Sequence, residues 1–292
     1  MQHLAFVTYR DAPALSADDA LAAESLARLG VRVTAQPWDD DGADWSRFRA
    51  IVLRSCWNYH RDPDRFTAWL DRLVDAGAVL VNPPTLLRWN VSKSYLLELQ
   101  QRGAPVIATI RIPRGAATTL DRLAAQSAWT EVVVKPVVSA DGHGARRFRL
   151  PATDHDERAF HALLQDRDVL VQPFVPEVIR EGEWSFVFLG GAFSHAVVKR
   201  PSAQEFRVQA RYGGTAHAVS APPELVEQAA ALLRLAPARS VYARVDGCVV
   251  GSRLTLMELE LLEPALYLAC DQGAPDRFAR VLMDHLEAAA AR

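Results

Sequence analysis

Residues 257–264 read MELELLEP and combine the leucines of a buried β-strand with three carboxylates. Side chains alternate between the two faces of a strand, so Glu258 and Glu260 are expected close together on one face. Two buried carboxylates repel each other and lose their hydration, so they must take up a proton or find cations. The stretch therefore predicts a strand that carries a charged site.

The composition predicts a globular protein with a substantial core. The chain has 292 residues, 50% of them hydrophobic and 23% charged, and a formal net charge of −2. This balance gives no electrostatic argument for a nucleic acid or an anionic membrane as a partner, so we expect neither. The N-terminus has no basic region followed by a long apolar core, which argues against a signal peptide or a membrane anchor. Three widely separated cysteines fit no zinc or disulfide pattern, so a cytoplasmic location is expected.

Strands and helices alternate through the first 88 residues, which predicts a parallel α/β domain. The expected strands are 3–8, 31–38, 50–57 and 78–84, and the expected helices are 17–29 and 63–76. Ligands gather beyond the carboxyl ends of parallel strands, so residues 8–10 and 54–59 are candidate substrate contacts. The alternative is that the aromatic side chains there only pack at strand ends.

The second part of the chain predicts antiparallel sheets with helices. A helix over 92–102 is followed by a hairpin whose strands, 131–137 and 145–150, flank a polar loop. Further expected elements are a helix at 154–167, a strand at 168–175, a meander over 183–201, a helix at 222–235, strands at 240–250 and 252–263, and a helix from 275. The predicted fold class is therefore α/β, with α+β character in the second half.

A lysine inside an apolar strand marks a candidate anion site. Lys135 interrupts VVVKPV, and a buried ammonium needs an anion as its partner. Ser139, Gly142 and Gly144 follow in a loop of small side chains, whose N–H groups can close over phosphate oxygens. The sequence has no Walker loop and no GxGxxG turn after the first strand. Phosphate binding and an ordinary glycine turn both fit this pattern.

Three carboxylates on two successive strands are a candidate metal site. Asp246 lies two residues after Arg244, on a strand expected to pair with the one that carries Glu258 and Glu260. Carboxylate oxygens at this density suit Mg²⁺, which completes its coordination with water and phosphate. The alternative is a set of edge-strand carboxylates in solvent, matched by Arg244 and Arg253.

Taken in order, these segments resemble the ATP-grasp superfamily over about residues 89–264. WNVSKSY followed by GAPVIAT is similar to the family's N-x-x-K helix and G-x-P-V-x-x-T segment, and VVVKPVVSADGHGARRF resembles its second lysine strand and phosphate loop. The nucleotide contacts that this resemblance implies are Lys93, Lys135, Ser139, Gly142, Gly144, the adenine-binding hinge Gln172, Pro173, Phe174 and Val175, and Glu177 or Glu183 at the ribose.

The resemblance also implies the residues of the reacting centre. Magnesium ligands are expected at Asp246, Glu258 and Glu260, with Arg244 beside the γ-phosphate. Position 260 carries glutamate where most of the superfamily has asparagine, which leaves open whether one or two ions bind. The segment EFRVQARYGG resembles the one that supplies an arginine to the reacting centre.

The resemblance implies three parts and a homodimer. A Rossmann-like substrate domain is expected over 1–88, followed by a central ATP-grasp subdomain with the lid loop over 89–175 and a C-terminal subdomain with the metal site over 176–292.

The activity implied is that of a Mg²⁺- and ATP-dependent ligase that converts a small amino-acid-like carboxylate into an acyl phosphate. VLRSCWNYH, RWN-x-x-K and ELELLEPALYL are most similar to a branch that includes the cyclo-ligase of D-cycloserine biosynthesis, which acts on O-ureido-D-serine. Lys199 and Arg207 are candidates for the substrate carboxylate or acyl phosphate, or are solvent-exposed. Glu263 faces a substrate amine or is a turn acid. A peptide or protein substrate, and a non-catalytic ATP sensor, are the alternatives.

Overall fold

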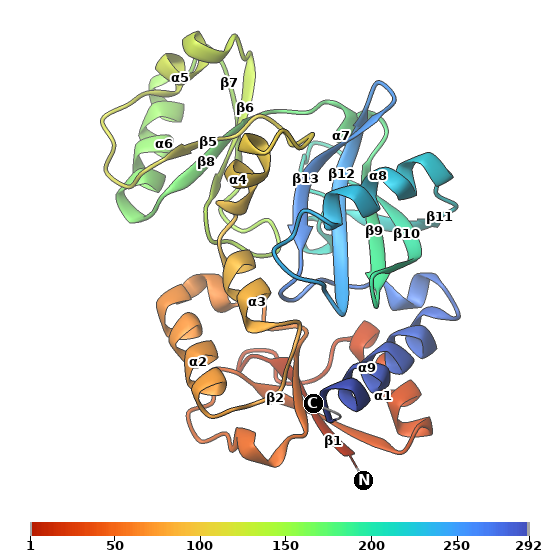
Figure 1. The fold of residues 1–292 in the computed structure, drawn as a ribbon. Helices are drawn as coiled ribbons and strands as arrows, with labels where there is room; N and C mark the ends of the chain where they lie inside the picture. The colour runs from red at the N-terminus through yellow and green to blue at the C-terminus, as the bar shows by residue number, and fades with distance from the viewer. Residues whose placement is uncertain (1, 291–292) are drawn as a thin grey trace.

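The computed structural model describes residues 2–290, which form three β-sheets with helices packed on them (Figure 1). The first sheet is parallel and the other two are antiparallel, so the predicted fold class is confirmed. Within the described residues, no helix combines the length and the apolar character needed to cross a bilayer. The cytoplasmic location stays a prediction.

The first sheet has the strand order β2-β1-β3-β4. Its strands are β1 (Gln2–Thr8), β2 (Val31–Pro37), β3 (Ala50–Leu53) and β4 (Leu80–Val81), and its first two helices are α1 (Ala17–Arg28) and α2 (Pro63–Asp75). Both helices begin at side-chain caps, Ser16 for α1 and Asp62 for α2, which satisfy free N–H groups of the first turn. The strand predicted over 50–57 ends at Leu53, after which Arg54 pairs with Asp19 of α1.

The C-terminal helix α9 (Ala274–Ala290) returns to this first sheet and lies beside α1 (Figure 1). Its Phe278 and Leu282 share one apolar cluster with Leu4 and Phe6 of β1. The division at residues 88 and 175 stays a prediction, and α9 is a part of the last segment that packs on the first.

The middle sheet has the order β5-β8-β6-β7 and carries two helices on one face. Its elements are β5 (Ile110–Ile112), β6 (Glu131–Pro136), β7 (Arg146–Arg149), β8 (Val169–Pro173), α5 (Leu120–Ser127) and α6 (Asp154–Asp166). Val132 and Val134 of β6 pack into the core under these helices. Because side chains alternate along a strand, Val133 and Lys135 point to the opposite face.

The third sheet has five strands in the order β11-β10-β9-β12-β13. Its elements are β9 (Glu183–Leu189), β10 (Ala192–Arg200), β11 (Thr215–Val219), β12 (Tyr242–Val250), β13 (Arg253–Glu260) and the covering helix α8 (Pro223–Leu233). The remaining short helices are α7 (Glu177–Arg180) and the 3₁₀ turns Trp45–Arg47, Tyr59–Arg61, Ala210–Tyr212 and Leu268–Cys270. In Figure 1 the middle and third sheets lie above the first. The predictions missed α3 (Pro84–Val91), α5, α7 and β11.

The helix predicted over 92–102 begins too early, because residues 92–94 are not helical and separate two shorter helices. The helices are α3 (Pro84–Val91) and α4 (Tyr95–Gln101). Ser92 is extended, and its hydroxyl accepts a hydrogen bond from the backbone N–H of Ser94. The backbone N–H of Lys93 instead donates to the carbonyl of Val137 at 2.8 Å, which ties the break to the end of β6.

Candidate active site

A cavity of about 380 Å³ lies between the middle sheet and the third sheet. The predicted residues that line it are Lys93, Lys135, Ser139, Gly142, Gln172, Pro173, Phe174, Val175, Glu183, Lys199, Arg207, Arg244, Asp246, Glu258 and Glu260. Two predicted nucleotide residues lie elsewhere: Gly144 packs on Pro136, where a Cβ would lie 2.8 Å away, and Glu177 begins α7. Glu183 is thus the carboxylate of the predicted ribose pair that reaches the cavity.

A β-bulge decides which face of β13 carries the carboxylates. The core leucines of this segment are Leu254, Leu256, Leu259 and Leu261, so their spacing is two residues, then three, then two. Met257 is the extra residue, at a shift in register with β12. Because of this shift, Glu258 and Glu260 face the cavity, whereas uninterrupted alternation from Leu256 would point both of them into the core.

Gly247 allows β12 to approach the bulge closely. A Cβ at this position would lie 2.5 Å from a carbonyl oxygen of β13, closer than non-bonded atoms approach. Beyond the bulge, Asp246 stands opposite Glu258, and Arg244 stands opposite Glu260. The two strands that carry the three carboxylates are therefore paired as predicted.

Buried cations hold the carboxylates of β9 and β12. Asp246 accepts hydrogen bonds from Lys199 at 2.9 Å and from Arg244 Nη2 at 2.8 Å, and Arg244 also pairs with Glu260. Lys199 reaches Glu183 at 2.6 Å. Although burial opposes charge, Arg244 and Lys199 lower the pKa of Asp246, and Asp246 and Glu183 raise the pKa of Lys199. The contacts of the Lys199 ammonium are thus two carboxylates, and its predicted role at a substrate anion stays a prediction.

The surroundings of Glu260 favour its neutral form. Burial, opposed by Arg244 but reinforced by Asp246 and Glu258, raises the pKa of Glu260 to about 8. For Glu258 the balance is reversed: burial is outweighed by Lys93 and Lys135, which lower its pKa. Glu258 and Glu260, two residues apart on one strand, therefore differ in how readily they carry a charge.

Lys93 reaches the cavity from the break between α3 and α4. Its ammonium lies 2.6 Å from Glu258 Oε1 and donates to the carbonyl of Ser139 at 2.5 Å. Lys93 thereby joins β13 to the start of the glycine loop.

Asn90 positions this strand, and the sequence reasoning missed its role. Its side-chain amide donates to the carbonyl of Leu259 at 2.7 Å, and its oxygen accepts from the N–H of Leu261 at 2.7 Å. Asn82 makes the same kind of two-way contact with Val241 and Leu261. The sequence does contain a signal for these contacts, namely the two asparagines in apolar segments shortly before Lys93. A buried amide group must find both hydrogen-bond donors and acceptors, so such asparagines indicate a structural role.

Lys135 is a partly buried cation without an ion pair among the residues that the structure describes. It lines the cavity on the exposed face of β6, and burial lowers the pKa of its ammonium, in spite of the opposing charge of Glu258. A lysine in such a place is costly unless an anion joins it. This is the strongest anion-binding feature of the cavity.

One part of the cavity is apolar. Its lining there includes Ile107, Val133, Val178, Val208 and Met257, next to the predicted hinge at 172–175. Gln172 is held by a hydrogen bond to Thr109 Oγ1 at 2.9 Å. An apolar slot beside convergent charges suits a ligand with a flat apolar ring and an anionic tail.

The glycine loop is covered from outside by the segment 207–212. Gly142 has a positive φ of 67°, and a Cβ there would lie 2.7 Å from the side-chain oxygen of Gln209. Arg211 pairs with Asp141 at 3.4 Å, and the guanidinium of Arg207 lies 3.5 Å from the ring centre of Tyr212. The loop is therefore held closed over the cavity.

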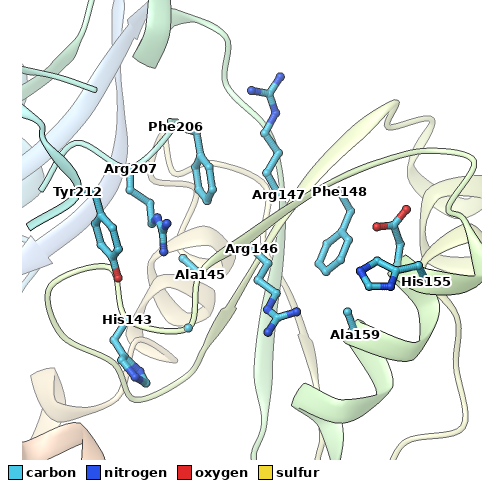
Figure 2. Close-up of a pocket in the computed structure, with 12 residues that line it drawn as sticks. His143, Ala145, Arg146, Arg147, Phe148, His155, Ala159, Phe206, Arg207 and Tyr212 are labelled. Atoms are coloured by element: carbon cyan, nitrogen blue, oxygen red, sulfur yellow. The ribbon is translucent and has the colours of Figure 1, made fainter. Parts of the chain in front are cut away.

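A second hollow of about 580 Å³ opens on the other side of this loop (Figure 2). Figure 2 shows Tyr212 and Arg207 facing each other above His143, with Arg146, Arg147, Phe148 and His155 along the other wall. Arg207 is shared with the inner cavity. Because it lines both spaces, it lies at their border. It also forms an ion pair with Glu205 at 2.6 Å.

The N-terminal candidates separate into a core group and a cavity group. Arg54 is 1% exposed and pairs with Asp19 at 2.7 Å, so it belongs to the core of the first part. Trp57 and Tyr59 line the cavity. Trp57 Nε1 donates to the carbonyl of Glu263 at 3.1 Å, and Glu263 itself is 7% exposed and lines the cavity.

The carboxylate set fits Mg²⁺ by its chemistry. All its donors are carboxylate oxygens on two paired strands, and oxygen is the ligand that Mg²⁺ prefers. Within the described residues, no group of three His, Cys, Asp or Glu side chains has the arrangement of a metal site, because lysines and arginines hold these carboxylates instead. The metal role of Asp246, Glu258 and Glu260 stays a prediction.

Two family models match the chain. Residues 4–82 match the N-terminal domain of D-cycloserine synthetase DcsG, and residues 106–260 match the ATP-grasp domain of prokaryotic glutathione synthetase. The predicted likeness to the D-cycloserine branch and to an ATP-grasp fold is confirmed.

Related proteins agree with these models. The cycloserine biosynthesis protein DcsG of Streptomyces lavendulae is 32% identical over 280 residues, which are 90% of this chain and 92% of that protein. The crystal structure of D-cycloserine synthetase DcsG superposes with a TM-score of 0.86 at 30% identity, covering 97% of this chain and 99% of that one. The D-alanine–D-alanine ligase of Bacillus anthracis, in complex with ATP, shares the fold, with a TM-score of 0.70 at 14% identity over 99% of this chain and 98% of that one. The chain therefore belongs to the ATP-grasp family of ATP-dependent ligases.

Proposed function

We propose that this ligase activates the carboxylate of a small amino-acid-like substrate and closes a ring by intramolecular attack of a nitrogen, with O-ureido-D-serine as substrate. The observation that carries the proposal is the likeness to a cycloserine biosynthesis protein over nine-tenths of the chain, including the N-terminal part that reaches the cavity wall. A place in antibiotic biosynthesis follows from the same proposal.

The charged part of the cavity suits phosphoryl transfer. The γ-phosphoryl group of ATP passes to a carboxylate oxygen, which gives ADP and an acyl phosphate. In this proposal Lys93, Lys135 and Arg244 offset the charge on the phosphoryl oxygens, and Lys135 contributes most because no carboxylate already pairs with it. Asp246, Glu258 and Glu260 would hold Mg²⁺, which would supply further positive charge at these oxygens.

The second step forms the ring. The substrate nitrogen attacks the carbonyl carbon, a C–N bond forms, the bond to the phosphate oxygen breaks, and the nitrogen loses a proton. Water would compete as a nucleophile, so the acyl phosphate must be shielded. The glycine loop, held by the contacts of Gly142 and Asp141 with the segment 207–212, serves as that shield. Gln172 to Val175 and Glu183 hold the nucleoside in this scheme.

Incubation with ATP, Mg²⁺ and O-ureido-D-serine tests the proposal. We expect ADP release and a cyclic product by mass spectrometry, with no ADP release when the substrate is omitted. ADP release only with other amino-acid or peptide carboxylates would assign a different substrate. ATP binding without ADP release for every carboxylate would favour a sensor. The expected homodimer and a cytoplasmic location belong to this proposal and need separate measurements.

A further inference from the structure

The charges that line the cavity are almost all matched within the protein. Six carboxylates line it, and five have an ion pair among the described residues: Asp141 with Arg211, Glu183 with Lys199, Asp246 with Arg244, Glu258 with Lys93, and Glu260 with Arg244. Glu263 is the sixth and has no ion pair within residues 2–290. Among the lysines and arginines that line the cavity, Lys135 alone has no ion pair within residues 2–290. One acid and one base are thus left for a ligand.

Glu263 is held in place by the N-terminal part of the chain. It is 7% exposed, its carbonyl accepts from Trp57 Nε1, and its carboxylate is hydrogen-bonded to the Tyr59 hydroxyl. Tyr59 is 3% exposed and packs among the aromatic rings of the first core. The carboxylate is therefore presented rigidly, and one neutral donor is a poor substitute for a cation in a buried place.

The surroundings of Glu263 favour a positive ligand group. Burial raises the pKa of Glu263 to about 7, with Lys93 opposing this effect and Glu258 adding to it. A substrate ammonium would provide three N–H donors and a full charge, which matches a carboxylate and leaves room for the neighbouring phenol.

Building on the proposed function, we infer that Glu263, with the Tyr59 hydroxyl, binds the α-ammonium group of the substrate. An amino-acid carboxylate held in this way has its positive group at Glu263 and its negative group free to face the phosphoryl centre at Lys135. The two cavity side chains without ion pairs, Glu263 and Lys135, then bind the two charged groups of one amino acid. Glu263 is a specificity residue in this arrangement, because carboxylates without an α-amine leave it unpaired.

A comparison of O-ureido-D-serine with its des-amino analogue, 3-(ureidooxy)propanoate, tests the inference. For the wild-type enzyme we expect kcat/KM, measured by ADP release, to be about 10- to 100-fold higher with the α-amine present, the range for a charge-assisted hydrogen bond. Glu263→Gln should remove most of this preference by lowering kcat/KM for the amine-bearing substrate, while the Kd for ADP stays within about twofold. Tyr59→Phe should reduce the preference by a smaller factor, because it removes one hydrogen bond and keeps the ring.

The matched control is Glu224→Gln, an exposed acid at the start of α8, which should keep the full preference. An unchanged preference in a folded Glu263→Gln enzyme would overturn the inference and leave the proposed function standing. Equal wild-type kcat/KM for both compounds would do the same. If the wild-type enzyme releases ADP with no amine-bearing carboxylate, the proposed function fails and the inference fails with it.

Discussion

The inner cavity and the outer hollow lie on two sides of one glycine loop, and the inner cavity has the features of a site. The hollow of Figure 2 is rich in arginine. Its Arg147 is already paired with Glu131 and stacked 3.6 Å from the ring centre of Phe174. The inner cavity instead holds the partly buried Lys135 and the buried Glu263, neither of which has an ion pair among the described residues. Unmatched buried charge, rather than basic character, points to a ligand, because its cost must be offset by binding.

The largest expected effect comes from removing charge in the inner cavity. Glu258→Gln should lower kcat by more than about 100-fold, since the site would lose a carboxylate that the phosphoryl centre needs. The measurement is ADP release at saturating ATP, with thermal unfolding as the check on folding. Asp246→Asn should have a similar effect, and wild-type rates in both variants would contradict the metal assignment.

A comparison of two basic residues tests the contrast between the two spaces directly. Lys135→Met, in the inner cavity, should raise the KM for ATP or lower kcat by about 10- to 100-fold, since an unmatched cation is lost from the phosphate path. Arg146→Gln, in the outer hollow, should change neither constant by more than about twofold. Equal losses in the two variants would show that the outer hollow also takes part in the reaction.

A substitution beside the β-bulge should have an intermediate effect, because it disturbs the pairing of β12 with β13 and not a charge of the site. Gly247→Ala places a methyl group 2.5 Å from a carbonyl oxygen of β13 and should force the two strands apart. We expect the free energy of unfolding to fall by about 1–3 kcal/mol and activity to fall with it, because Glu258 and Glu260 lose their direction. Urea unfolding and steady-state kinetics measure both. Gly42→Ala is the control, since this glycine does not have a positive φ and a Cβ there would meet only Asp40 Oδ1, at an ordinary contact distance of 3.6 Å.

The smallest effect concerns the contact between the loop and the first part. His60 and His143 stack with ring centres 4.5 Å apart, and burial lowers the pKa of His60 to about 4 from 6.5. A base with a depressed folded-state pKa stabilises the fold above pH 6.5, and this contribution is lost as the pH falls from 6.5 towards 4. The free energy of unfolding of the wild type should therefore fall through this window more steeply than that of His60→Gln. Parallel curves for the two proteins would mean that His60 does not titrate in this way.

Much of the fold was predictable because the spacing of apolar residues within a short segment indicates whether that segment is a helix or a strand. The Ala17–Arg28 and Pro63–Asp75 helices, the hairpin around the glycine loop and the strand pair that carries Asp246 and Glu258 all have clear patterns. The break at Ser92–Ser94 was missed because it depends on a hydrogen bond from Lys93 to Val137, which lies far away in the chain. The positioning role of Asn90 was missed for the same reason.

The spacing of residue types by itself determined which chemistry this protein carries: lysines in and beside apolar strands, small residues in one loop, and carboxylates on successive strands. Only the tertiary structure decided which of these charges are neutralised inside the protein and which are left for a ligand. Ion pairing depends on distances of a few ångströms between segments remote in sequence. In the MELELLEP strand, the bulge at Met257 turns Glu258 and Glu260 towards their partners, and the segment 57–59 surrounds Glu263 with neutral groups.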